Sequence, residues 1–155
     1  MRYAVAAIGV GAGSTTLPSF SIYSSASKGF WLRELRVANT TTTAARYKLA
    51  RVSTRGTPGA AITEGEFNAA GTDNEFEAFA AHSVGPTIGT DLAVISLGAA
   101  AGSSVLLTFD RPYDPTGAAE EKGIYVPPGT ANGLAVVVAA GTGQVLDICA
   151  VVDAA

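Results

Sequence analysis

The sequence predicts a single, nearly all-β domain, built as a sandwich or a barrel. Short strand patterns recur along it, segments rich in Gly, Pro and Thr separate them, and helix signals are weak. With 155 residues the chain can bury a core without a disulfide or a metal. A lone cysteine, Cys149, excludes an internal disulfide framework and is interpreted as a small buried apolar residue.

Ten segments have the alternating or β-branched character of strands. They are 2–8, 20–23, 30–38, 44–52, 75–84, 92–97, 103–109, 123–126, 132–140 and 144–152. The turns between them include 55–59 (RGTPG) and 84–90 (VGPTIGT). The strongest helix candidate is 64–70, which Gly65 weakens, and 116–122 could form one turn.

The segments 34–37 and 45–48 are predicted to pair as a hairpin across a Thr-rich turn. The alternation of side chains then sets Arg36 opposite Arg46 on one face of the ribbon, with apolar residues on the other. Facing arginines repel one another mildly unless an acidic partner lies above them. The pair therefore indicates either a docked partner or two side chains that splay into water.

The last two strands are apolar on both faces, which is typical of strands buried on both sides. Two interpretations are open: loops of the same chain cap the outer face, or identical subunits pack against it. The second interpretation predicts a homo-oligomer with Val137 and Val151 in its interface.

Charge is distributed unevenly along the chain. Residues 1–60 hold eight basic side chains and one acidic, a net of about +7, whereas 61–155 hold two and twelve, a net of about −10. Either the two halves interleave and neutralise each other, or a basic face docks onto a partner. The candidate docking residues are Arg33, Arg36, Arg46, Lys48 and Arg51.

Signatures of chemistry are weak. The segment 9–14 (GVGAGS) follows an apolar strand, but Ser14 and the Pro18 that follows oppose the helix that a dinucleotide loop requires. His82 is the sole histidine, no nucleophile elbow accompanies it, and it is interpreted as a packed residue. The pair Asp110 and Asp114 most simply stabilises a turn, with a calcium site as the alternative. We therefore predict no enzymatic activity, no cofactor and no metal.

Two kinds of partner are also not expected. A net charge of −3 without an aromatic platform argues against nucleic acid. No apolar run approaches the roughly 18 residues of a membrane span, and the one near the N-terminus is too short for a signal peptide. The chain is expected to be made in the cytoplasm.

Three segments carry a family resemblance: 31–59 (WLRELRVANTTTTAARYKLARVSTRGTPG), 82–90 (HSVGPTIGT) and 123–153 (GIYVPPGTANGLAVVVAAGTGQVLDICAVVD). Together they resemble small virion proteins of tailed bacteriophages, over about residues 30–155. The resemblance implies a jelly-roll-like antiparallel β-sandwich, often a trimer. It also implies a place in the virion and a role in capsid decoration, or cement, on the major capsid protein or other virion subunits.

The resemblance brings no catalytic residues. Residues 1–29 lie outside it and are expected to form the first strands and a short N-terminal arm that orders on contact with the shell. The alternatives are a tail or fibre component and, from another class, a carbohydrate-binding β-sandwich. The latter would use exposed aromatic rings such as Trp31, although the sequence shows no aromatic cluster.

Overall fold

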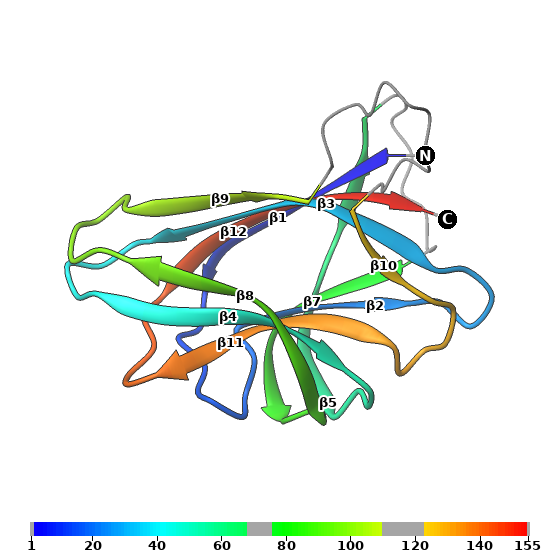
Figure 1. Ribbon diagram of the computed structural model, residues 1–155, viewed down its shortest axis with the longest axis horizontal. Coiled ribbons are helices and arrows are strands. Elements are labelled where there is room, and N and C mark those ends of the chain that lie inside the picture. The colour runs from blue at the N-terminus through cyan, green and yellow to red at the C-terminus, as the bar shows by residue number, and fades with distance from the viewer. Residues whose placement is uncertain (1, 68–75, 110–122, 155) are drawn as a thin grey trace, which may run out of the picture.

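The computed structural model describes residues 2–67, 76–109 and 123–154, and all regular structure within them is β. The strands form two antiparallel sheets that pack face to face, as Figure 1 shows with sheet A above and sheet B below. Sheet A contains β1 (Arg2–Val10), β3 (Phe30–Asn39), β6 (Glu64–Glu66), β9 (Ser104–Thr108), β10 (Ile124–Val126) and β12 (Leu146–Ala154). Sheet B contains β2 (Phe20–Ser24), β4 (Ala45–Val52), β5 (Thr57–Ile62), β7 (Phe76–Val84), β8 (Ile88–Leu97) and β11 (Gly133–Ala140). The predicted all-β sandwich is confirmed.

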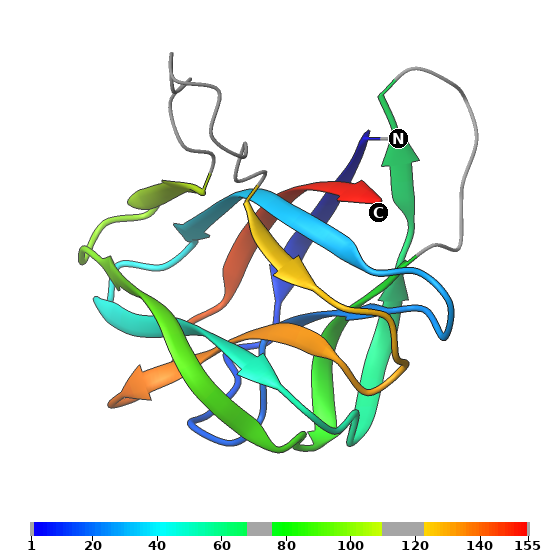
Figure 2. The same cartoon turned by 45° about the vertical axis from the view of Figure 1, so that its right-hand side comes forward.

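The strand order is that of a jelly roll. Sheet A contains the order β1-β12-β3-β9, and sheet B contains β2-β11-β4-β8, so the chain passes repeatedly from one layer to the other. These eight strands are the two interlocked Greek keys of that fold. Of the remaining strands, β6 lies beyond β1, and β5 and β7 extend sheet B beyond β2. The strand β10 pairs with the beginning of β3, on the edge whose later part pairs with β9 (Figure 2).

The main core lies between the two layers and is filled by every second residue of each strand. Its largest fully buried side chains include Tyr3, Tyr47, Phe30, Phe76, Leu32, Leu35 and Leu49. The rings of Tyr3 and Phe76 meet edge to face, 5.4 Å apart. The hydroxyl of Tyr47 lies 2.7 Å from the carbonyl oxygen of Ala12, so its polar end is satisfied although the ring is buried.

The predicted hairpin of 34–37 with 45–48 is wrong. The first segment belongs to β3 in sheet A and the second to β4 in sheet B, so the Thr-rich connection crosses between layers. Arg36 lies beside Cys149 in the neighbouring strand, and Arg46 lies on the other sheet. Buried and exposed side chains do alternate along both segments, but such alternation is the same for two strands that pair in one sheet and for two strands that face each other across a core.

Of the expectation for residues 1–29, the first strands are present, but β1 and β2 are part of the two sheets and do not form an arm that orders only on contact. The strand β1 lies between β12 and β6, and β2 lies between β7 and β11, so both are hydrogen-bonded on two sides. The alternation within 2–10 buries Tyr3, Val5 and Ala7, which ties this segment to the main core. The strands predicted at 2–8 and 20–23 are thereby confirmed.

Three short segments differ from expectation. Residues 64–66 of the predicted helix form β6, which gains its hydrogen bonds from β1. Residues 57–59, predicted as a turn, begin β5, which pairs only with β7; an edge strand tolerates Pro58 because its outer side needs no donor. The strand β8 begins at Ile88, within another predicted turn. Residues 68–70 and the possible helical turn at 116–122 lie outside the described residues.

Candidate interaction surface

Part of the outer face of sheet B is covered by the chain itself, although Arg46 and Val94 on the same sheet are exposed. A second group of apolar residues, here called the outer cluster, lies on this face and is separate from the main core. Its members are Tyr23, Val52, Ala135 and Val137, all buried, with the partly buried Phe79 and Ile88 against them. The strand β11 is therefore apolar on both sides because it separates two clusters within one chain.

Two connections close over the outer cluster: 53–56 between β4 and β5, and 85–87 between β7 and β8. They are joined by the backbone N–H of Thr87, which donates to the Thr54 hydroxyl at 2.6 Å. The guanidinium carbon of Arg55 lies 5.1 Å from the ring centre of Tyr23 and 5.2 Å from that of Phe79. The cover is thus made of two connections joined by hydrogen bonds and of one cation above two rings.

This cover decides the role of Val137. Its side chain is 0% exposed within a single chain, so Val137 is not an outward residue of an oligomer interface, and that prediction is wrong. The alternative interpretation, in which loops of the same chain cap the strand, is confirmed. Val151, the second predicted interface residue, is half-buried on the outer face of sheet A and remains a candidate.

His82 belongs to the cover of sheet B. Its Nε2 lies 2.8 Å from the Ser21 hydroxyl, and the side chain is 6% exposed. Ala81, with φ 63°, interrupts the alternation of β7, so that His82 and Phe79 share one face. Burial lowers the pKa of His82. Since Ser21 is fully buried, this pair is a packed hydrogen bond that no substrate could reach, as the sequence indicated for His82.

The outer face of sheet A is open. Because Leu146, Ile148 and Ala150 of β12 face the core, the residues between them face outward, together with their neighbours on β1, β3 and β9. We call this surface the sheet A face, and its residues are Ala4, Ala6, Ile8, Glu34, Arg36, Ala38, Ser104, Leu106, Thr108, Asp147, Cys149 and Val151. Ile8 is 88% exposed and Leu106 is 60% exposed.

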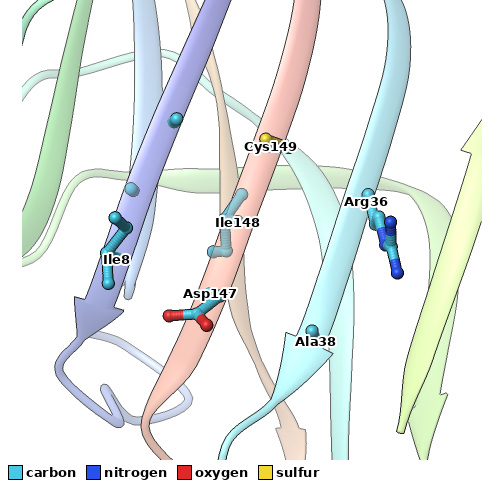
Figure 3. A pocket seen from close by; sticks show the side chains of 8 residues that line it. Ile8, Arg36, Ala38, Asp147, Ile148 and Cys149 are labelled. Carbon is cyan, nitrogen blue, oxygen red and sulfur yellow. The ribbon is translucent and has the colours of Figure 1, made fainter. Parts of the chain in front are cut away.

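Cys149 occupies the middle of the sheet A face. It is exposed, not buried as the sequence suggested, because it is one of the alternate residues of β12 that face away from the core. A shallow hollow of about 270 Å³ lies around it, lined by β1, β12 and β3 (Figure 3). The small side chains at Ala6 and Ala38 leave this space.

Two charged residues border the hollow. Asp147 points toward Ile8, and its Oδ1 accepts the backbone N–H of Gly9 at 2.8 Å, which supports the irregularity at the end of β1. Arg36 extends away from β12 in Figure 3. Within the described part of the chain it makes no ion pair. The face thus has an apolar centre with one cation, Arg36, and two carboxylates, Asp147 and Glu34, around it.

At the end of sheet A that contains Asp153, the charged side chains have ion-pair partners. Asp153 accepts from Arg2 at 2.9 Å and from Arg33 at 2.5 Å. Burial alone would raise the pKa of Asp153, but the two arginines outweigh it and hold that pKa below its ordinary value. Beside them the rings of Trp31 and Tyr125, paired across β3 and β10, lie 4.7 Å apart. This aromatic pair could not be predicted from the sequence, because only the strand register brings the two positions together.

The five predicted docking residues do not share one face. Arg33 and Arg36 belong to sheet A, whereas Arg46, Lys48 and Arg51 belong to sheet B. Three of the five have partners: Arg33 binds Asp153, Lys48 binds Asp91 at 2.9 Å, and Arg51 donates to the carbonyl of Tyr125 at 3.0 Å.

Ion pairs among the described residues join the two halves of the sequence. They are Arg2–Asp153, Arg33–Asp153, Lys48–Asp91 and Arg55–Glu77. Each combines a basic residue from the first 60 positions with an acidic residue from the rest. The interpretation that interleaved strands neutralise the charge division is therefore confirmed for these pairs.

Comparison with models of protein families and with curated proteins finds no match. Among the residues that the structure describes, no three His, Cys, Asp or Glu side chains gather where they could hold a metal ion. The carboxylates Asp110 and Asp114 lie outside those residues. No helix in the described ranges is long and apolar enough to cross a membrane.

Proposed function

We propose that this chain is a structural protein of a tailed-bacteriophage virion, acting as a capsid decoration, or cement, protein that stabilises the shell. The observation that carries the proposal is the contrast between the two outer faces. On sheet B the outer cluster is closed by the chain's own connections, and the exposed Val94 lies apart from it on β8, whereas the sheet A face leaves its apolar centre and two large side chains, Ile8 and Leu106, open. Such a surface is suited to association with protein.

The resemblance to virion proteins supports the same function. Its longest segments, 31–59 and 123–153, supply most of β3, β4, β11 and β12, which are neighbours at the middle of the two sheets. The resembling residues are thus the framework of the fold and not one peripheral loop. Jelly rolls are frequent in viral capsid proteins, although the fold by itself assigns no function.

A cement protein acts through contact area. It bridges neighbouring shell subunits, and the free energy of that contact opposes expansion and the pressure of the packaged DNA. Each exposed ion pair adds only about 0–1 kcal/mol, so apolar burial must supply most of the affinity. Attachment through several copies at once then multiplies a modest affinity per copy.

A carbohydrate-binding module is the second candidate, and the Trp31–Tyr125 pair favours it. Sugar rings stack on exposed aromatic faces, and Tyr125 is 37% exposed. The two rings already contact each other, however, which leaves less of each face for a sugar. Titration with neutral oligosaccharides, followed by tryptophan fluorescence at the single Trp31, tests this function.

Quantitative mass spectrometry of purified virions tests the proposed function. A copy number comparable to that of the major shell protein is the expected result. A handful of copies would instead indicate a tail or fibre component and would overturn the assignment to the capsid surface. Absence from washed particles would overturn the virion assignment as a whole.

A further inference from the structure

We propose that the sheet A face binds a second copy of this chain across a two-fold axis, so that two sheets pack face to face. The inference rests on the proposed function but assigns the sheet A face to contact between copies of the chain, so contact with the shell then uses other surfaces of the dimer. It concerns the purified chain in solution, so it can fail while the virion assignment stands, and the reverse also holds.

The shape of the face permits close approach of another sheet. Its central side chains, Ala4, Ala6, Ala38, Cys149 and Val151, are short, and packed sheets lie only about 10 Å apart. Four strands at about 4.8 Å spacing and some eight residues at about 3.3 Å rise cover roughly 500 Å². Two such faces bury about 1,000 Å² in total, which is near the lower limit for a specific protein interface.

The arrangement of charges fits a copy of the same surface. Neighbouring strands set Cys149 beside Arg36, and in the next outward position along the strands they set Asp147 beside Ala38. Consider a two-fold axis that runs across the strands between these two rows. It sets Asp147 of each copy over Cys149 of the other, on the strand beside Arg36, and the Arg36 side chain must turn from its direction in Figure 3 toward β12 to reach the carboxylate.

Every contact in such an interface occurs twice, so one dimer contains two ion pairs between Arg36 and Asp147. This pairing resolves the energetic difficulty of the face. An arginine buried against an unrelated apolar surface would lose its hydration with only Glu34, the next outward residue of β3, near it, whereas a second copy presents a further carboxylate to it. Asp147 retains its second oxygen for this purpose, since Oδ1 holds the N–H of Gly9.

Charge reversal tests the pairing. Arg36→Glu alone and Asp147→Arg alone each set like charges against each other, and each should weaken dimerisation at least tenfold in sedimentation-velocity titrations. An equimolar mixture of the two variants restores opposite charges in both pairs and should recover a mixed dimer. A mixture that stays monomeric while both variants are folded by circular dichroism would overturn the proposal, as would a wild-type monomer or trimer at micromolar concentration.

A matched pair of apolar positions tests the face without touching Asp147, whose loss also removes the bond to Gly9. Leu106 on the sheet A face and Val94 on sheet B are 60% and 58% exposed. Leu106→Asp should weaken dimerisation at least tenfold, and Val94→Asp should leave it within twofold. Equal effects of the two substitutions would contradict the assigned face.

The single thiol supplies a direct probe of burial. Cys149 is exposed in one chain and lies at the centre of the proposed interface. Its rate of reaction with a maleimide should fall at least tenfold when the wild-type concentration rises through the dimer dissociation constant. Arg36→Glu should react at the fast rate throughout that range. A wild-type rate that does not depend on concentration would overturn the proposal.

Discussion

The Nε2 of His82 and the hydroxyl of Ser21 lie 2.8 Å apart beneath the connections that close sheet B. Because burial lowers the pKa of His82 from 6.5, the folded chain binds this proton less readily than the unfolded chain does. Stability from this group is present above about pH 6.5 and is lost as the pH falls from there toward the folded pKa. The loss by pH 5.5 should be at most about 1.4 kcal/mol.

Urea unfolding at pH 7.5 and pH 5.5 measures this loss. His82→Gln is the comparison, because its amide can still bond Ser21 but does not titrate. Carboxylates contribute equally to both proteins, so the difference between the two drops in unfolding free energy belongs to His82. An identical drop in the two proteins would contradict the predicted linkage.

Arg55 should stabilise the fold through the rings beneath it. Arg55→Ala removes the cation above Tyr23 and Phe79 and uncovers both rings, and we expect a loss of about 1–2 kcal/mol in unfolding free energy. The ion pair with Glu77 contributes less than about 1 kcal/mol of this, since it is partly exposed. Arg46→Ala, an exposed change on the same sheet, should stay within about 0.5 kcal/mol. Equal losses would show that the rings gain nothing from Arg55.

Val137 should behave as a core residue. Val137→Ala opens a cavity between β11 and its cover, and we expect a loss of about 2 kcal/mol in thermal or urea unfolding. Val151→Ala, on the half-buried outer side of β12, should cost less than about 1 kcal/mol when measured on the monomer. The opposite order would mean that the outer cluster is not closed in solution.

Cys149 should be dispensable for folding. The side chain is exposed, so Cys149→Ser should change the unfolding free energy of the monomer by no more than about 0.5 kcal/mol. A thiol titration of dilute native protein should consume one equivalent of reagent without denaturant. Slow reaction that denaturant accelerates would indicate a buried thiol.

Strand positions were largely predictable, because the period of two is a local property of the backbone. The pattern of 2–8 located β1, and the run at 132–140 located β11. The strand at 57–62 was missed because Pro58 and Gly59 are typical of turns, and only its place at the edge of sheet B makes them acceptable. The short β6 was missed because its stabilising hydrogen bonds come from a distant strand, β1.

The candidate surface was less predictable than the strands. The residues on both sides of 145–152 are apolar enough for burial, as are those of the strand before it. The sequence did not reveal that loops cover the second face of β11 and not that of β12. Likewise, the charge division was visible, whereas its meaning required the ion pairs Lys48–Asp91 and Arg33–Asp153. These pairs join residues 43 and 120 positions apart, beyond the reach of any local pattern.

The sequence by itself determined the class of fold, because alternation, turn residues and the lack of helical periodicity all act over a few neighbours. The tertiary structure alone decided which strands share a layer, because alternation is the same for a strand beside its partner and for one across the core. That choice separated Arg36 from Arg46 and closed Val137 beneath a loop. It also left Cys149 at the centre of an open face, since a strand in a sandwich has one side turned to the core and the other to whatever the rest of the chain leaves uncovered.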